Sequence, residues 1–166
     1  MNSRQRNLVL EAKRLIRGKE IVIDSCLLLL LVVGSIDRSG ISSRKGLKQF
    51  SADHFDFLLL MILQAPRLVI LSHVVAETHS LIGRCYDRAR LIGFLGQLVC
   101  DNIDSRRNSC WASRQPEFLY LGFTDVLLIQ AADRQNRVLL TIDFGLYTAS
   151  RNRGIDAINF NHYIDD

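Results

Sequence analysis

The sequence predicts an α/β protein in which helices cover both faces of a parallel sheet. Short apolar runs alternate along the 166-residue chain with longer segments of helical periodicity. Strands that alternate with helices join through right-handed crossovers, and such units build a parallel sheet between two helical layers. We therefore expect a three-layer α/β/α fold with a central parallel sheet of about five strands, plus an extra N-terminal helix.

Five short apolar runs are predicted as strands. The first contains Ile21-Val22-Ile23, and consecutive β-branched residues are typical of a strand that is buried on both faces of a parallel sheet. The expected strands are 20–24, 68–71, 118–121, 138–142 and 155–160.

The segments around these strands are predicted as helices and loops. The first helix, 5–18, has an apolar face opposite basic residues and ends at Gly18, a plausible C-cap. We expect residues 1–19 to form this amphipathic helix and residues 20–166 to form one domain. Further helices are expected at 25–33, 51–64, 73–82, 86–102, 144–152 and between 125 and 135, with loops at 34–48 and 104–116.

The charge and hydropathy of the chain favour an anionic partner over a membrane. The formal net charge is +4, and the arginine-rich basic residues suit phosphate groups, whose oxygens match the guanidinium fork. The apolar run 21–36 is too short to span a bilayer and contains Asp24. The N-terminus lacks the apolar run of a signal peptide before the first strand. We therefore expect a cytoplasmic protein with no membrane partner.

The four cysteines are expected to be free thiols. Cys26, Cys85, Cys100 and Cys110 contain no C-x-x-C pair, and most lie in or beside apolar or helical segments. Buried thiols in a reducing cytosol explain this pattern better than disulfides or a zinc site.

Four acidic residues follow predicted strands. Asp24 and Asp143 end strands, Asp125 opens the helix after a strand, and Glu77 lies in the helix after another. The carboxyl ends of parallel strands form one edge, where ligands bind in open α/β sheets. Clustered carboxylates repel one another, and Mg²⁺ or Mn²⁺ relieves that repulsion. Such a metal can activate water against a phosphodiester.

Each acid also has a structural interpretation. Asp24 and Asp143 can N-cap the helices that follow them, and Asp125 can cap its own helix, with Thr124 as the alternative cap. Glu77 can be a solvated helix residue. It is the set of four, in this order, that favours a metal site.

The order and local context of the acids resemble the PIN-domain family, the nuclease fold of VapC-like toxins and of several RNA-processing enzymes. The resemblance covers roughly residues 20–160. Its segments are Ile21-Val22-Ile23-Asp24-Ser25, Ser72-His73-Val74-Val75-Ala76-Glu77, Gly122-Phe123-Thr124-Asp125-Val126-Leu127-Leu128-Ile129-Gln130-Ala131-Ala132 and Leu139-Leu140-Thr141-Ile142-Asp143-Phe144-Gly145-Leu146.

The resemblance implies an Mg²⁺- or Mn²⁺-dependent endoribonuclease, a hydrolase of phosphodiester bonds. Its catalytic and metal-binding acids would be Asp24, Glu77, Asp125 and Asp143, with Ser25 and Thr141 in support. Residues 20–166 would then be the PIN-like nuclease domain. Unlike the family's small toxins, the chain has a helix before the first strand and a long segment at 34–66.

RNA is the expected substrate. The arginines expected to bind its phosphates follow elements that carry a site acid: Arg84, Arg88, Arg151 and Arg153. A toxin would have an antitoxin or another protein as a partner, and a homodimer is a further expectation.

Other functions stay open from the residues alone. A PIN-like scaffold could bind RNA or protein without cutting, and a phosphoryl-transfer or receiver-type domain also uses acids at this edge, although no P-loop is present. A zinc site is an alternative interpretation of His73, Glu77 and His79, but the H-E-x-x-H motif is missing. Trp111 and Tyr120 could stack on bases or simply pack.

Overall fold

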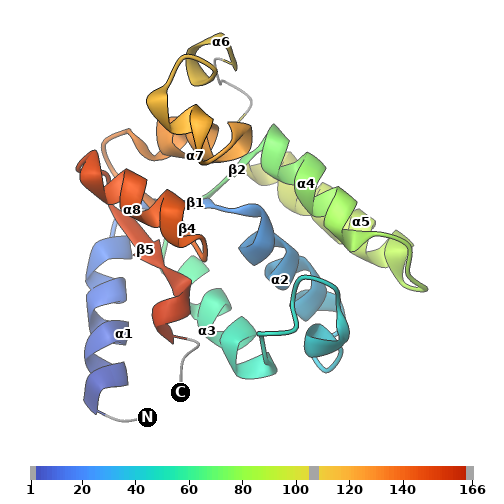
Figure 1. The fold of residues 1–166 in the computed structure, drawn as a ribbon. Helices are drawn as coiled ribbons and strands as arrows, with labels where there is room; N and C mark the ends of the chain where they lie inside the picture. The colour runs from blue at the N-terminus through green and yellow to red at the C-terminus, as the bar shows by residue number, and fades with distance from the viewer. Residues whose placement is uncertain (1–2, 105–108, 164–166) are drawn as a thin grey trace.

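A computed structural model of the protein describes residues 3–104 and 109–163 (Figure 1). The strands are β1 (Glu20–Ile23), β2 (Leu68–Leu71), β3 (Ile103–Asp104), β4 (Arg137–Thr141) and β5 (Ala157–Asn159). The α-helices are α1 (Ser3–Ile16), α2 (Ser25–Ile36), α3 (Ala52–Ile62), α4 (Ser72–Ile82), α5 (Arg88–Asn102), α6 (Ser109–Ala112), α7 (Phe123–Ala132) and α8 (Phe144–Asn152). Three short 3₁₀ helices are η1 (Ile41–Ser43), η2 (Pro116–Leu119) and η3 (Phe160–Tyr163).

The strands form a parallel sheet in the order β3-β2-β1-β4-β5. Within residues 3–104 and 109–163, four strands of three to five residues make up its body, and β3 contributes Ile103–Asp104 at one edge. The predicted strands at 20–24, 68–71, 138–142 and 155–160 are confirmed to within two or three residues. The expected sheet of about five full strands is therefore reduced to four, although the mixed α/β architecture is consistent with three layers.

The strand predicted at 118–121 is wrong, because the chain forms η2 there. Pro116 occupies the start of that turn, where its missing N–H and fixed φ are tolerated. The side chains of Phe118, Leu119 and Tyr120 are exposed, whereas a strand in the middle of a parallel sheet would be buried on both faces. The chain instead crosses to β4 through η2 and α7.

The order of the strands creates a switch point between β1 and β4. From β1 the chain moves outward through β2 to β3, and from β4 it moves outward in the opposite direction to β5. Right-handed crossovers then place α2, α4 and α5 on one side of the sheet and α7 and α8 on the other (Figure 1). A crevice forms at the carboxyl ends of the two strands where the order reverses.

Helix α2 is the centre of the core. Every residue from Leu27 to Gly34 is buried, and a helix that is apolar on all sides is stable only when other elements surround it. It packs against α3, α4 and α5. Of the described helices, none is long and apolar enough to cross a membrane.

The N-terminal helix packs on the domain. Ala12 and Ile16 of α1 are buried, and the helix contacts α3 and η3. Gly18 follows with φ +75°, a left-handed conformation that turns the chain into β1.

All four cysteines are free. Cys26 and Cys85 are partly buried, as expected of thiols beside the core. Cys100 and Cys110 are exposed, so the prediction that the thiols are buried is wrong for these two, which lie at the polar end of α5 and in α6.

We predict opposite effects of the same substitution at two helical glycines. A Cβ at Gly34 would lie 2.2 Å from the Phe55 ring where α2 meets α3, whereas a Cβ at Gly96 in α5 meets nothing within 4 Å. Gly34→Ala should lower the free energy of unfolding by about 1–3 kcal/mol through overpacking. Gly96→Ala should raise it by about 0.5–1 kcal/mol. Urea denaturation measures both, and equal changes would show that α2 and α3 are not closely packed at this point.

Candidate active site

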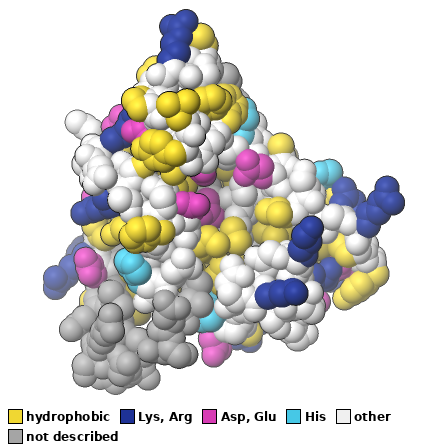
Figure 2. Space-filling view, viewed as in Figure 1, with side chains coloured by type: hydrophobic (Ala, Val, Ile, Leu, Met, Phe, Trp, Pro, Cys, Tyr) yellow, Lys and Arg dark blue, Asp and Glu magenta, His cyan; other side chains and the backbone are white. Residues whose placement is uncertain are grey.

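The four acids lie around the crevice at the carboxyl edge of the sheet. Asp24 follows β1, Asp143 follows β4, Asp125 lies in the first turn of α7 and Glu77 lies in α4. Figure 2 shows acidic side chains gathered near the centre of the face that is drawn, with hydrophobic and basic side chains around them. Elements from both sides of the sheet therefore contribute carboxylates to one place.

Asp24 is the most deeply buried of these four acids, with 6% of its surface exposed. One carboxylate oxygen accepts a hydrogen bond from the Leu27 N–H at 2.9 Å and so caps α2. The other accepts from the Ile142 N–H at 3.0 Å, just after β4. Burial raises the pKa of Asp24, although these N–H groups and the Thr141 hydroxyl oppose the rise.

Thr141 connects two of the acids. Its fully buried hydroxyl bonds to Asp24 and accepts a hydrogen bond from the Asp143 N–H at 2.9 Å. The exposed Asp143 in turn accepts from the Leu146 N–H at 2.7 Å, which caps α8. The structural interpretation of Asp24 and Asp143 as helix caps is therefore correct, and each cap holds its carboxylate at the crevice.

Glu77 bridges three helices. The Ser25 hydroxyl donates to one of its oxygens at 2.6 Å, and the Thr124 hydroxyl donates to the other. These bonds join α4 to the starts of α2 and α7. From the sequence Thr124 was expected only as a helix cap, and its place directly before Asp125 is the signal that could have revealed its contact with Glu77.

Asp125 differs from the other three acids. Its half-buried carboxyl makes no hydrogen bond or ion pair with any residue that the structure describes. It does not cap α7, and neither does Thr124, because Gly122 (φ +106°) stands at the cap position without a side chain. The expectation of a cap here is wrong. Burial, followed by the charges of Asp143, Glu77 and Asp24, raises the pKa of Asp125 to about 7.

The chemistry of this donor set fits a hard divalent cation. All four groups are carboxylates, and two of them have oxygens that accept no hydrogen bond from a described group: both oxygens of Asp125 and the second oxygen of Asp143. Mg²⁺ and Mn²⁺ prefer such oxygens and retain several waters. Within the described ranges, however, no three His, Cys, Asp or Glu side chains lie close enough together to hold an ion directly. Waters would have to complete its coordination.

Of the four arginines expected at the RNA backbone, only Arg84 is exposed without an ion pair to the described residues. Arg88 donates to the Gly83 carbonyl at the end of α4 and lies beside His79. Arg151 and Arg153 lie at the end of α8 remote from Asp143.

Arg153 donates hydrogen bonds to both carboxylate oxygens of Glu117, at 2.7 and 2.6 Å. The Arg151 guanidinium lies 3.6 Å from the Asp156 carboxylate. These two side chains hold the α8 end of the domain together. Their placement does not favour contact with RNA at the crevice.

The histidines do not form a zinc site with Glu77 among the described residues. The ring of His73 packs edge-on against Phe123 at 5.1 Å, and its buried Nδ1 lacks a partner there. Trp111 packs partly against the core, whereas Tyr120 is exposed.

Comparison with known proteins gives no functional assignment. No family model matches the chain, and no curated protein matches it. A solved structure described as "A domain of a functionally unknown protein from Methanocaldococcus jannaschii DSM 2661" is similar, with a TM-score of 0.43 and 19% identity over 84% of this chain and 89% of that chain. Function must therefore be argued from the residues of the site.

The raised pKa of Asp125 predicts how stability depends on pH. The carboxyl titrates near pH 7 in the folded protein and near 3.8 when unfolded, so folding retains a proton that the unfolded chain releases. This contribution is complete below about pH 4 and is lost as the pH rises through about 7. The raised pKa of Asp24 acts in the same direction.

In the presence of a metal chelator, Asp125→Asn should therefore raise the melting temperature at about pH 7.5 and change it little near pH 4. Each kcal/mol of unfolding free energy that is gained should raise the melting temperature by about 2–4 °C. Asp53→Asn on α3 removes an exposed carboxylate away from the cluster as a control. An equal change in melting temperature at both pH values would mean that the pKa of Asp125 is not raised in the folded protein.

Proposed function

We propose that the protein is a divalent-metal-dependent endoribonuclease with a PIN-like site formed by Asp24, Glu77, Asp125 and Asp143. The observation that carries the proposal is the state of Asp125. A half-buried carboxyl that has no hydrogen-bond or ion-pair partner in residues 3–104 and 109–163, beside three other carboxylates, destabilises the fold. Such unsatisfied, perturbed groups are concentrated at functional sites.

The three other acids support the proposal through the way they are held. Asp24 and Asp143 are fixed by backbone N–H groups, and Glu77 is fixed by two hydroxyls, one of them from Ser25. Rigid supporting contacts of this kind keep ligand oxygens in place. Each carboxylate oxygen has two lone pairs, so an oxygen that accepts one N–H can still bind a cation or a water.

When bound at these acids, Mg²⁺ or Mn²⁺ would supply a water of lowered pKa and would stabilise charge on a phosphodiester. Asp125 would help to hold the cation, whose charge would offset the neighbouring carboxylates that contribute to the raised pKa of this group. The buried Thr141 hydroxyl keeps Asp24 and Asp143 in register on either side of the crevice.

A PIN-like scaffold that binds RNA or a protein without cutting is the second candidate. It is favoured by the separation of the acids, since no close group of three ligands exists among the described residues. The exposed apolar side chains of Leu119 and Tyr120, at the end of η2, would suit a protein partner such as an antitoxin.

Cleavage separates the two candidates. The protein should cut a labelled single-stranded RNA in Mn²⁺ or Mg²⁺ and should be inactive in chelator. Asp125→Asn should lower the rate by on the order of 10²–10³-fold, as expected for one electrostatic group of an active site. Asp133→Asn, at the other end of α7, is the matched control and should cut normally. RNA that is bound but remains intact in Mn²⁺ would establish the scaffold.

Metal binding should also stabilise the fold. A cation that binds only the native state at 100 times its Kd adds about 2.7 kcal/mol, so saturating Mn²⁺ should raise the melting temperature by several degrees. The shift should disappear in Asp125→Asn/Asp143→Asn and persist in Asp133→Asn. If the folded parent protein has the same melting temperature with and without millimolar Mn²⁺, the metal site is contradicted.

A further inference from the structure

Two neighbouring helix faces, one on α2 and one on α4, lead from the acids toward a surface pocket. Ser25, Leu29 and Val33 recur every four residues along α2, and Glu77 and Leu81 do so along α4, so each series lies on one helical face. The Ser25–Glu77 hydrogen bond joins the two faces at the acidic end. One helical turn, about 5.4 Å, separates this end from Leu29 and Leu81.

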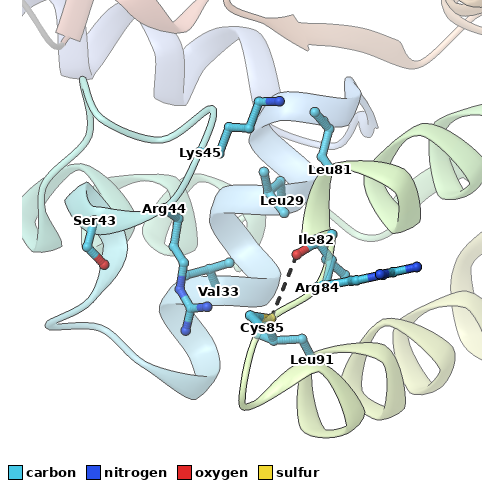
Figure 3. A pocket seen from close by; sticks show the side chains of 11 residues that line it. Leu29, Val33, Ser43, Arg44, Lys45, Leu81, Ile82, Arg84, Cys85 and Leu91 are labelled. Atoms are coloured by element: carbon cyan, nitrogen blue, oxygen red, sulfur yellow. Dashed lines mark hydrogen bonds between the residues drawn. The ribbon is translucent and has the colours of Figure 1, made fainter.

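This pocket, called the groove below, has a volume of about 260 Å³ (Figure 3). Its lining is more apolar than polar and comes from α2, the loop after η1, the end of α4 and the start of α5. The lining includes Leu29, Val33, Leu81, Ile82, Cys85 and Leu91. Pockets for drug-sized ligands measure about 300–1,000 Å³, so this one suits a smaller planar group.

Two cations flank the pocket. Lys45 extends over its opening toward Leu81, and Arg84 leaves the opposite wall toward solvent (Figure 3). Both side chains are exposed, and neither makes an ion pair within the ranges that the structure describes. An apolar pocket between two unneutralised cations is complementary to an aromatic group joined to phosphates.

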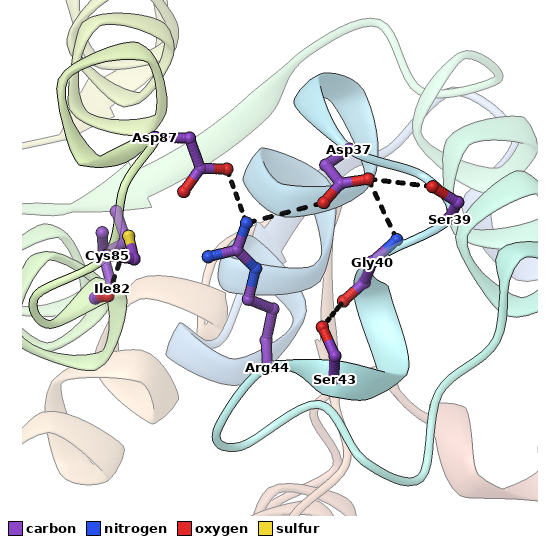
Figure 4. Close-up of polar contacts among 8 residues, drawn as sticks. All are labelled: Asp37, Ser39, Gly40, Ser43, Arg44, Ile82, Cys85 and Asp87. Atoms are coloured by element: carbon purple, nitrogen blue, oxygen red, sulfur yellow. Dashed lines mark hydrogen bonds and ion pairs between the residues drawn. The ribbon is translucent and has the colours of Figure 1, made fainter.

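Arg44 holds the wall that carries Lys45 in place. Its guanidinium contacts the buried Asp87 at 2.5 Å and Asp37 at 3.6 Å (Figure 4). Burial opposes the charge of Asp87, but Arg44 keeps the pKa of that carboxyl below its ordinary value. The loop after η1 is thereby attached to the α4–α5 connection. Arg44 also lies 5.6 Å from the ring of Tyr86, which is 89% exposed.

We infer that this pocket binds one nucleobase of a single-stranded RNA, next to the nucleotide whose phosphate lies at the acids. Lys45 and Arg84 contact the phosphates on either side, and Tyr86 offers a stacking surface. The inference rests on the proposed function, because it takes the acids as the point from which the RNA extends.

The chemistry favours a single strand over other partners. Proteins bind single-stranded nucleic acids by combining a cationic groove with surfaces on which bases stack. A base can enter the pocket only if it is unpaired and splayed from its neighbours, which is how single-stranded RNA is recognised. The adjoining acids repel an anionic backbone, so the cations beside the groove must offset that repulsion in the absence of metal.

Salt-dependent binding tests the two cations. In an Asp125→Asn background, fluorescent single-stranded oligoribonucleotides are titrated over a salt series. Lys45→Ala/Arg84→Ala should weaken binding. It should also make the negative slope of log K against log[salt] shallower, by ~0.7 for each lost phosphate contact and by ~1.4 for both. Lys13→Ala/Arg14→Ala on α1 removes the same two residue types away from the groove and should leave the affinity and the slope unchanged.

Protection of Cys85 tests the pocket itself. Its partly buried thiol lines the pocket, whereas Cys100 and Cys110 are exposed elsewhere and serve as internal references. Burial raises the pKa of Cys26 to about 12, so that thiol should react slowly. At an RNA concentration of ten times its Kd, alkylation of Cys85 should slow about tenfold while both references stay unchanged, as mass spectrometry of the peptides would show.

Neither readout needs cleavage, so the two proposals can fail separately. Suppose that the parent protein does not cut RNA, but RNA protects Cys85 and the salt slope falls in the Lys45/Arg84 variant. The RNA-binding proposal is then supported and the nuclease proposal is refuted. If RNA is cut while the Lys45/Arg84 variant keeps the parent's affinity and slope, the groove is refuted. Equal alkylation of Cys85 with and without bound RNA also refutes it, and leaves the pocket to a protein partner.

Discussion

The two hydrogen bonds accepted by Asp24 join the parts of the fold on which the site depends. One reaches the start of α2 and the other reaches the chain just after β4, so a single buried carboxylate ties both sides of the switch point together. The switch point exists because the chain leaves β1 and β4 in opposite directions. A charged group in this crevice is expensive to bury, and the backbone N–H groups and Thr141 offset only part of that cost.

The free-energy cost of placing charged carboxylates in the crevice increases with each further acid. Asp143 and Glu77 are compensated by local hydrogen bonds, and both therefore stabilise elements as well as the site. Asp125 receives no hydrogen bond from the residues that the structure describes, and burial, followed by the charges of the neighbouring acids, raises its pKa. Local propensity, capping and packing agree throughout most of the chain, so a position where they do not agree indicates selection for something other than stability.

The sequence predicted the elements whose signals are local and failed where tertiary contacts decide. The apolar runs of β1 and β2 and the capped start of α8 follow from periodicity and caps, and their bounds agree with the structure within a residue or two. The segment at 118–121 has the same composition as a strand, but its side chains are exposed around η2. Arg153 looked available for phosphate because nothing in the sequence shows that Glu117 would reach it.

The site also needs a connection between its two sides, and Glu77 provides it. Asp24 and Ser25 belong to the side held by the apolar α2, whereas Asp125 belongs to α7 on the other side of the sheet. Two hydroxyls, from Ser25 and Thr124, meet on the Glu77 carboxylate, so the spacing of the acids is set by hydrogen bonds between helices. Hydrogen bonds to an exposed carboxylate break and re-form more easily than a packed core deforms. The acids are therefore held in two ways, by the buried cores of α2 and α7 and by more adjustable hydrogen bonds at Glu77.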